Sequence, residues 1–205
     1  MKYHIENNTL LIKGNFEAIS TGINGGMSKV SCIFNHSVTS DFEYKDPIEY
    51  VVNLAQLNDI KGKYFGLLTA VDMTNLCIEQ NENMTVFVTA GITHPSPFKL
   101  KNIGTINIII VSKIALSKGA MASAIITATE AKSLCLLDLG FDFLGTTTDA
   151  VVVAEDKTSS KNGDTITQYT GSYTEFGSDL IKSVKKCVCS SILKTHPEIS
   201  TNLVD

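Results

Sequence analysis

The sequence predicts a single α+β domain over residues 1–205, built from a mixed, mainly antiparallel sheet with helices packed on it. Three observations lead to this fold class. The 205 residues have 43% hydrophobic content, which is enough for one sizeable core. The first half of the chain is rich in strand-like segments, and the second half alternates between helix, strand and helix. No internal repeat divides the chain.

The first strands are short and lie on either side of a polar connection. We expect strands at Thr9–Lys13 and Val30–Asn35, with His36 at the end of the second. The residues between them, Asn15–Gly26, are rich in Gly, Ser, Thr and Asn and end in Asn24-Gly25-Gly26, which is typical of a turn. This connection lacks the Gly-Lys-Ser/Thr ending of a P-loop, so it does not predict binding of nucleotide phosphates.

A helix is predicted from Asp46 onwards, because the residues there are typical of a helix start. Asp46 caps the helix, Pro47 fits its first turn, and Glu49 can reach back to the cap. The apolar residues that follow share one stripe, which comprises Ile48, Val51, Val52 and Ala55. We expect this helix to be part of the scaffold.

Three strand-like segments follow this helix. They span Lys63–Met73, Leu76–Gln80 and Met84–Ala90, and the turn Asn81-Glu82-Asn83 joins the last two. Such short connections predict an antiparallel meander. The next segment, Gly91–Pro97, must be a loop, because two prolines so close together preclude a helix or a central strand.

A strand and a long helix come next. Thr105–Val111 is strongly β-branched and predicts a strand, and a helix begins at Ser117 and ends at Gly140, a residue typical of a helix C-terminal cap.

The long helix has two unusual faces. Ser123, Thr127 and Glu130 share one of them, because they are spaced by four and then three residues. The adjoining face is small and comprises Ala120, Ala124, Ala128 and Ala131. The polar face predicts contact with either solvent or a polar pocket.

The densest polar chemistry of the chain lies between this helix and the next strand. Thr146-Thr147-Thr148-Asp149 precedes the apolar run Ala150–Val153, which predicts a buried strand. The junction puts hydroxyls, a carboxylate and free backbone N–H groups at the end of a strand, where ligands bind in layered α/β domains. The alternative is a connecting loop in which Thr and Asp satisfy local backbone groups.

The C-terminal part predicts a polar loop, a short strand and a helix. The loop spans Glu155–Thr165 and the strand Thr165–Tyr169, and Thr170–Gly177 leads into the helix. The helix has one apolar stripe, which comprises Leu180, Ile181, Val184, Cys187, Val188 and Ile192. The opposite face has Lys182, Lys185 and Lys186.

Composition and charge exclude several classes of partner. The net charge of −4 provides no basic surface of the kind that binds nucleic acid. The N-terminal residues are polar where a secretory signal is apolar, and no run approaches the roughly 18 apolar residues of a membrane span. We therefore expect a soluble cytoplasmic protein that binds neither nucleic acid nor membrane.

The cysteines and histidines do not predict a disulfide or a metal site. The five cysteines are odd in number, scattered and mostly within apolar strings, so we expect them to be reduced and buried. They are Cys32, Cys77, Cys135, Cys187 and Cys189. The spacing of Cys187 and Cys189 is not that of a zinc knuckle, and the four histidines are isolated from one another.

Several segments match, in order and spacing, those of a known family. Three of them are Gly104–Ile109, Ile125–Lys132 and Gly145–Ala154. Four more are Ser20–Gly26, Gly66–Val71, Thr89–Thr93 and Gly171–Gly177. Together they cover most of the chain and resemble the adenosylcobinamide amidohydrolases, which are enzymes of corrinoid salvage in cobalamin biosynthesis. His94 is a departure, because the family usually has asparagine at this position.

The resemblance implies hydrolysis of the amide that joins the aminopropanol arm of adenosylcobinamide to the corrin ring, without ATP. The catalytic residues are then expected among Asp149, Glu130, Thr147 and Thr148. Asp149 or Glu130 would be the base, and the threonines would bind the oxyanion or supply a nucleophile. The residues expected to bind substrate are Asn24, Gly25, Thr93, His94, Thr127, Thr146 and Glu175. The corrinoid is the substrate, so neither a cofactor nor a metal is expected, and the protein can be a homo-oligomer.

Two other functions fit the same residue types. The chain can be a corrinoid-binding protein without catalytic activity, or an amidohydrolase or acyltransferase that acts on a smaller amide. The sequence has neither a Gly-x-Ser-x-Gly elbow nor a Cys/His pair that would predict an acyl-enzyme mechanism.

Overall fold

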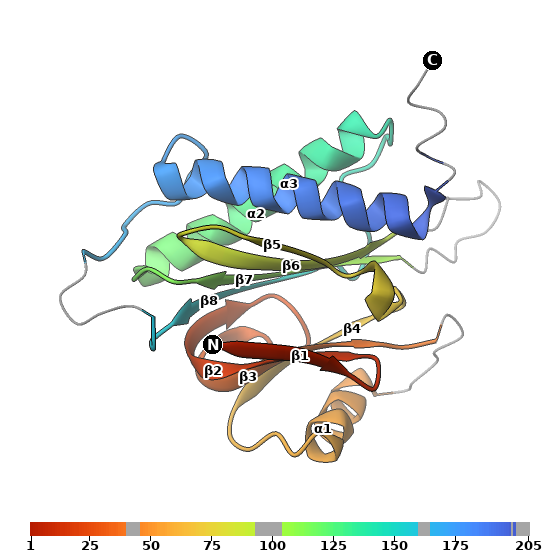
Figure 1. Ribbon diagram of the computed structural model, residues 1–205, viewed down its shortest axis with the longest axis vertical. Helices are drawn as coiled ribbons and strands as arrows, with labels where there is room; N and C mark the ends of the chain where they lie inside the picture. Colours follow the sequence, from red (N-terminus) through yellow and green to blue (C-terminus); the bar gives the residue numbers. More distant parts are fainter. Residues whose placement is uncertain (40–45, 93–103, 160–164, 198, 200–205) are drawn as a thin grey trace.

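The chain folds into a mixed sheet that bends over itself and has helices on its two outer faces (Figure 1). The computed structural model describes residues 1–39, 46–92, 104–159, 165–197 and 199. In chain order, the elements are β1 (Lys2–Glu6), β2 (Thr9–Ser20), β3 (Gly26–Ser37), α1 (Pro47–Leu57), β4 (Tyr64–Thr69), the 3₁₀ helix η1 (Met73–Asn75), β5 (Cys77–Gln80), β6 (Met84–Gly91), β7 (Thr105–Ser112), α2 (Lys118–Asp138), β8 (Ala150–Asp156) and α3 (Glu175–Thr195).

The strand order confirms the predicted α+β fold class. The sheet formed by the described residues runs β4-β3-β2-β8-β7-β6-β5, and β1 pairs with β2 outside this path. The pairs β3–β4 and β7–β8 are parallel, and the remaining pairs are antiparallel. The sheet is therefore mixed and mainly antiparallel.

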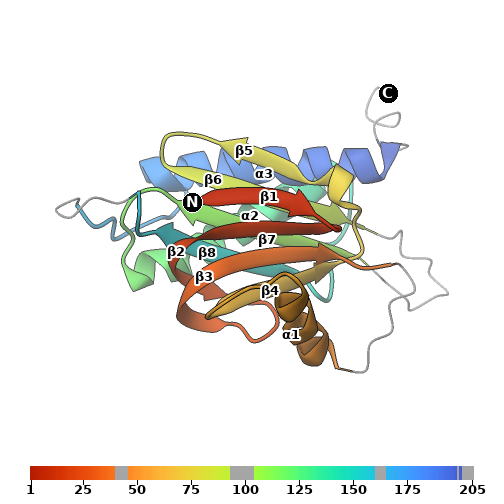
Figure 2. The same cartoon turned by 60° about the horizontal axis from the view of Figure 1, so that its bottom comes forward.

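Strand β2 makes the bend, because its two halves have different neighbours. Residues 9–13 pair with β1 and residues 16–20 pair with β8, whereas β3 runs along both halves. The register shifts between Lys13 and Phe16, and the Phe16 ring occupies the space that a side chain at position 14 would need. Strand β1 thereby lies over β6 (Figure 2). The ring centroids of Tyr3 and Phe87 are 5.0 Å apart there.

This bend produces four layers. Helices α2 and α3 cover one face of β5–β8, strands β1–β4 lie against the other face, and α1 packs on the outside of β1–β4 (Figures 1 and 2). Strand β7 is buried on both faces: Ile106 and Ile108 contact the helices, whereas Ile109 and Val111 face the other strand layer. Polar groups of β7 on this second face therefore lie between two strand layers.

Three predicted features of the first half are wrong. Strand β2 continues to Ser20, so the predicted connection Asn15–Gly26 shrinks to residues 21–25. Strand β4 ends at Thr69 and pairs in parallel with β3, because α1 carries the chain from one strand to the other. It is therefore not part of the antiparallel meander, which comprises β5, β6 and β7.

The predicted polar loop after β8 begins too early. Glu155 and Asp156 belong to β8 and are 2% and 1% exposed. Glu155 accepts a hydrogen bond from the backbone N–H of Leu116 and pairs with Lys157, and Asp156 accepts bonds from the turn that follows it. These partners permit the burial of two carboxylates, which hydrophobic patterning alone does not predict.

Two smaller predictions also need correction. The predicted strand Thr165–Tyr169 is reduced to one bridge between Thr167 and Leu116. In α1, Asp46 caps the helix as predicted, but Ile48 and Val52 are exposed. The buried residues of α1 are Val51, Leu54 and Ala55.

Helix α2 is the core helix of the protein. Ser117 caps its start, Gly140 with φ 83° follows its end, and its alanine face is buried, all as predicted. By length and composition alone, α2 could cross a membrane, but half of the relevant stretch is buried inside the protein. Thr174 caps α3, whose apolar stripe packs on the sheet as predicted.

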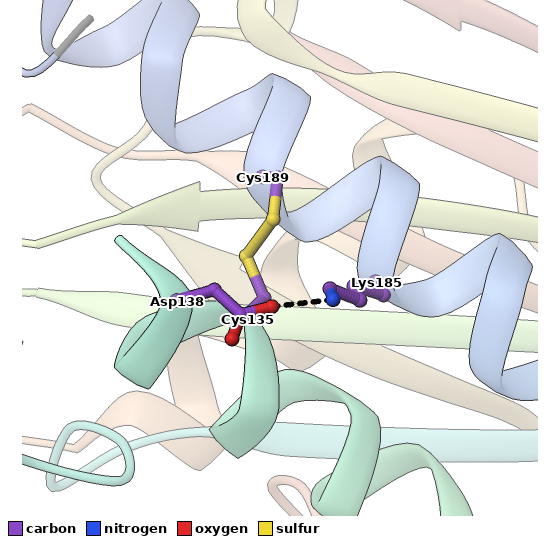
Figure 3. The surroundings of a disulfide bond; sticks show 4 residues. All are labelled: Cys135, Asp138, Lys185 and Cys189. Atoms are coloured by element: carbon purple, nitrogen blue, oxygen red, sulfur yellow. Dashed lines mark ion pairs between the residues drawn. A yellow bond between two sulfur atoms is a disulfide. The ribbon is translucent and has the colours of Figure 1, made fainter. Parts of the chain in front are cut away.

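The prediction of five reduced cysteines is wrong. Cys135 of α2 and Cys189 of α3 form a disulfide, next to an ion pair between Asp138 and Lys185 (Figure 3). The two cysteines are 54 residues apart in sequence, and only the packing of α2 against α3 brings their Cα atoms to 5.9 Å. Cys32, Cys77 and Cys187 are free and buried.

Candidate functional site

A pocket of ≈ 370 Å³ lies between the two strand layers, at the edge where β3 and β4 end and β7 and β8 begin. Its lining comes from six segments that are separate in sequence. The lining residues are Gly22, Ile23, Val38, Thr39, Pro47, Leu67, Leu68, Thr69, Ala70, Gly104, Thr105, Asn107, Thr148 and Ala150. A pocket of this size can accommodate a small ligand or one arm of a larger one.

Glycine at position 22 allows the loop after β2 to approach the pocket wall. A Cβ atom there would lie 2.4 Å from the Leu67 side chain and 3.4 Å from Ala150. Thr21 fixes the same loop to β8, because its backbone N–H donates to Val151 and its hydroxyl accepts from the Val151 N–H. Gly22 and Ile23 are thereby placed in the pocket lining.

A chain of buried amides forms the polar part of the pocket. Asn107, which is 1% exposed, donates from Nδ2 to the carbonyl oxygen of Leu68 at 2.8 Å and to Oδ1 of Asn35 at 2.9 Å. Asn35, 2% exposed, donates in turn to Oγ1 of Thr89 at 2.9 Å. These bonds connect β7, β4, β3 and β6 across the space between the strand layers.

Two threonines complete the polar lining. The Thr105 hydroxyl donates to the carbonyl oxygen of Thr148 at 3.1 Å and lies 3.4 Å from Oδ1 of Asn107. Oγ1 of Thr69 accepts from the backbone N–H of Val71 at 3.1 Å. Hydroxyl and amide groups of this kind bind and orient polar ligands in apolar pockets.

The turn 146–149 is held by Asp149. One carboxylate oxygen accepts from the backbone N–H of Ile106 at 2.9 Å and from the Thr146 hydroxyl at 2.6 Å. The other accepts from the Thr146 N–H at 3.1 Å and from Nζ of Lys132 at 2.5 Å. A Cβ at Gly145 would lie 2.4 Å from both charged groups, so any side chain there would have to displace the ion pair. Asp149 thereby ties the turn to β7 and α2.

Some of the predicted site residues lie at or beside this pocket. Thr148 lines it, and its hydroxyl lies 3.3 Å from the carbonyl oxygen of Gly104. Thr146 and Asp149 form the turn that positions Thr148, and Thr147 is exposed on that turn. Asn24 and Gly25 belong to the same loop as Gly22 but line a separate hollow.

Other predicted site residues lie in the helix layer, away from the pocket. The Thr127 hydroxyl is buried and donates to the carbonyl oxygen of Thr170, and Glu130 is exposed. Glu175 begins α3, whose first turns contact the β5–β6 connection through Asp179 and Asn83, at the opposite end of the sheet from the pocket. The structure therefore does not bring these residues together with Thr148. Thr93 and His94 lie outside the described residues.

The charges near the pocket are few. Within the part of the chain that the structure describes, no titratable side chain lines the pocket and no group of three or more His, Cys, Asp or Glu side chains is arranged to bind a metal ion. His36 of β3 lies on the α1 side, where Nδ1 is 2.7 Å from the Thr9 hydroxyl and Nε2 is 3.4 Å from the Tyr50 hydroxyl. Burial lowers the pKa of His36 below its ordinary value.

Sequence reasoning missed the residues that form the amide chain. Asn107 belongs to the β-branched strand Thr105–Val111, where a polar residue between Ile106 and Ile108 signals a buried polar group. Asn35 gave a similar signal within an apolar strand, but nothing in the pattern connected it with Asn107, which is 72 residues further on.

Comparison with known proteins supplies the family. A family model described as adenosylcobinamide amidohydrolase matches residues 2–199. An adenosylcobinamide amidohydrolase of Methanosarcina mazei is 48% identical over 190 residues, which cover 91% of this chain and 94% of the relative. An uncharacterized protein of Methanocaldococcus jannaschii is 30% identical over 233 residues, with 92% and 87% covered.

A third relative is more distant. This adenosylcobinamide amidohydrolase of Halobacterium salinarum is 29% identical over 188 residues, which cover 85% of this chain and 79% of the relative. No solved structure matches the chain. Because the family model spans nearly the whole chain, and the Methanosarcina relative is similar along almost all of it, this chain belongs to the adenosylcobinamide amidohydrolase family.

Proposed function

We propose that this protein hydrolyses the amide between the aminopropanol arm and the corrin ring of adenosylcobinamide, giving adenosylcobyric acid and aminopropanol. Family membership and the names of two relatives support this reaction. Water supplies a hydroxyl group to the carbonyl carbon and a proton to the leaving amine. The reaction is therefore balanced without ATP.

One structural observation carries the proposal. Four of the family segments, which are spread between residues 20 and 154, converge on one pocket. They contribute Gly22 and Ile23, Leu67 to Ala70, Gly104 to Asn107, and Thr148 with Ala150. A fifth segment contributes Thr89 to the amide chain behind the pocket. Shared segments that meet around a cavity are expected when the cavity holds the common substrate.

The size of the pocket restricts how the substrate can bind. A corrin ring with its adenosyl ligand is far larger than a pocket of ≈ 370 Å³. We therefore propose that the aminopropanol arm enters the pocket and that the ring stays outside. The arm is short and ends in a hydroxyl, and it meets a lining of apolar side chains together with threonines and one asparagine.

The chemistry needs stabilisation of a tetrahedral oxyanion. The Thr148 hydroxyl is the proposed donor, because it lines the pocket and its contact with Gly104 is long, at 3.3 Å. Asp149 is proposed as the anchor of this turn and not as the base, because both of its carboxylate oxygens already accept hydrogen bonds. The proposal assigns no catalytic role to Glu130 or Glu175.

We also propose a cytoplasmic location and no partner other than the corrinoid. The net charge of −4 argues against nucleic acid, and the packing of α2 inside the protein argues against insertion in a membrane. Size-exclusion chromatography with light scattering would determine whether the chain forms a homo-oligomer.

The direct test is to incubate the purified protein with adenosylcobinamide, without ATP, and to detect adenosylcobyric acid by mass spectrometry. We expect turnover, and we expect Thr148→Val to lower kcat/KM by roughly tenfold to a hundredfold. Thr129→Val is a matched control, because Thr129 is exposed on α2 and, among the described residues, its hydroxyl bonds only to the carbonyl oxygen of Ile125 in its own helix.

Two outcomes would contradict the proposal. Tight binding of adenosylcobinamide without turnover, over a range of pH and with divalent metals, would favour a corrinoid-binding protein. Turnover of small amides with no action on adenosylcobinamide would favour an amidohydrolase or acyltransferase of another substrate class.

A further inference from the structure

The orientation of the Asn107 amide is fixed by its partners. The carbonyl oxygen of Leu68 can only accept a hydrogen bond, so the atom of Asn107 that lies 2.8 Å from it must be the nitrogen. The same nitrogen donates its second proton to Oδ1 of Asn35, 2.9 Å away. Asn35 donates in turn from Nδ2 to Oγ1 of Thr89. Both N–H groups of Asn107 are therefore used.

The oxygen of Asn107 retains capacity to accept a hydrogen bond. Its one neighbouring donor within the described residues is the Thr105 hydroxyl at 3.4 Å. That hydroxyl has a single proton and a closer acceptor, the carbonyl oxygen of Thr148 at 3.1 Å. Asn107 lines the pocket and is 1% exposed, so a ligand in the pocket is the natural donor to this buried oxygen.

The Thr69 hydroxyl can donate a hydrogen bond into the pocket, whereas the Asn107 oxygen can accept one. Oγ1 of Thr69 accepts from the Val71 N–H, but no acceptor for its hydroxyl proton lies within the described part of the chain. Thr69 is 1% exposed and lines the pocket, and it follows Leu68, whose carbonyl oxygen holds Asn107. The pocket lining thus contains both a hydrogen-bond donor and an acceptor, on neighbouring strands that the bond between Asn107 and Leu68 connects.

This arrangement is complementary to one chemical group. A secondary amide offers a carbonyl oxygen, which accepts, and an N–H group, which donates. We propose that Thr69 and Asn107 recognise the substrate arm as a pair, with Thr69 donating to the amide carbonyl oxygen and Asn107 accepting from the amide N–H. This inference rests on the proposed function and adds the requirement that the substrate be a secondary amide.

The requirement can be measured on the wild-type protein. Two amides of adenosylcobyric acid serve as probes: the propylamide, which keeps the N–H but has no hydroxyl, and the N-methyl-N-(2-hydroxypropyl)amide, which has a hydroxyl but no N–H. We expect kcat/KM for the N-methyl amide to fall by on the order of a hundredfold or more relative to adenosylcobinamide. The propylamide should stay within about tenfold.

The opposite order of the two probes would mean that Asn107 binds the alcohol of the arm and would overturn the proposal. Equal hydrolysis of all three amides would overturn it as well. If adenosylcobinamide is not turned over, the proposed function fails, and the dissociation constants of the three amides then decide the inference separately.

Variants of Asn107 and Thr69 test whether these two residues cause the preference for the secondary amide. Asn107→Leu keeps the branched shape but removes the acceptor together with the two N–H donors, and it should reduce the preference for the secondary amide to less than about tenfold. Thr69→Val should lower kcat/KM for adenosylcobinamide by roughly tenfold to a hundredfold. Thr85→Val is the matched control for Thr69→Val, because Thr85 is also a buried strand threonine but does not line the pocket.

Thermal unfolding of each variant separates loss of recognition from loss of structure. A folded Asn107→Leu variant that keeps the full wild-type selectivity would contradict the assignment. If Asn107→Leu does not fold, the wild-type probe series alone decides between the outcomes given above.

Discussion

Lys132 on α2 and Asp149 before β8 form an ion pair of 2.5 Å whose side chains are only 9% and 13% exposed. Asp149 accepts three further hydrogen bonds, from the Ile106 N–H and from two groups of Thr146. The pair therefore connects the helix layer with the turn that carries Thr148 into the pocket.

We predict that Asp149→Asn acts mainly on stability. The change leaves the buried Lys132 ammonium without its counter-charge and turns an amide NH₂ towards hydrogen-bond donors. The expected loss is about 3–5 kcal/mol of unfolding free energy, measured by urea denaturation. The exposed pair Lys185–Asp138 is the matched control, and Asp138→Asn should cost less than about 1 kcal/mol.

A double-mutant cycle measures the coupling energy between Lys132 and Asp149. Lys132→Met combined with Asp149→Asn should cost clearly less than the sum of the two single changes, because neither then leaves an unpaired charge. Near-wild-type stability of Asp149→Asn, together with a hundredfold loss of kcat, would instead favour Asp149 as a general base.

The number of free thiols distinguishes the disulfide of the structure from the five reduced cysteines that the sequence predicts. Denatured protein without reductant should show three thiols, and reduced protein should show five, because Cys135 and Cys189 are bonded. The variant Cys135→Ser should show four thiols without reductant. Five thiols in unreduced wild-type protein would restore the expectation from the sequence.

The free cysteines should also be unreactive in the native protein. Burial raises the pKa of Cys32 to about 11 and that of Cys187 to about 12, so few thiolates exist at pH 8. We expect alkylation of both residues to be slow until the protein unfolds. Rapid native-state labelling of either residue, located by peptide mass spectrometry, would be inconsistent with this burial.

We predict that protonation of His36 lowers the unfolding free energy in mild acid. Burial lowers its pKa in the folded state, whereas the unfolded chain takes up the proton at the ordinary histidine pKa of about 6.5. The stability contributed by neutral His36 is therefore complete above that pKa and is lost as the pH falls towards the folded-state pKa. Urea denaturation of wild type and His36→Gln at pH 7.5 and 5 should show the smaller pH dependence in the variant. Identical pH dependence would exclude His36 as the cause.

We predict that replacement of Thr85 by valine stabilises the protein. It is 0% exposed, and its hydroxyl has no hydrogen-bond partner among the residues that the structure describes. Thr85→Val should raise the unfolding free energy by about 1 kcal/mol, because a buried unpaired hydroxyl is replaced by a methyl group. Thr89→Val on the same strand should have the opposite effect, since Thr89 accepts the hydrogen bond from Asn35. A destabilised Thr85→Val would mean that the hydroxyl has a partner.

Elements with local sequence signals were predicted correctly. Asp46 and Ser117 capped the helices that they predicted, because a cap binds backbone N–H groups two or three residues away. The apolar stripe of α3 predicted its buried face for the same reason, since helical periodicity is a property of neighbouring residues. The order of the shared segments was also sufficient to identify the family.

Which polar residues meet depends on the packing of distant segments. Thr148 and Asn107 line one pocket because β7 and β8 pair in parallel, and Asn35 reaches Asn107 because β2 bends the sheet over itself. Glu130 and Glu175 lie in the helix layer, on the other side of strands β5–β8 from that pocket, although their segments also resemble the family. The disulfide between Cys135 and Cys189 likewise depends on the packing of two distant helices. Contacts of this kind are set by strand pairing and layer packing over long separations, which local periodicity and composition do not specify.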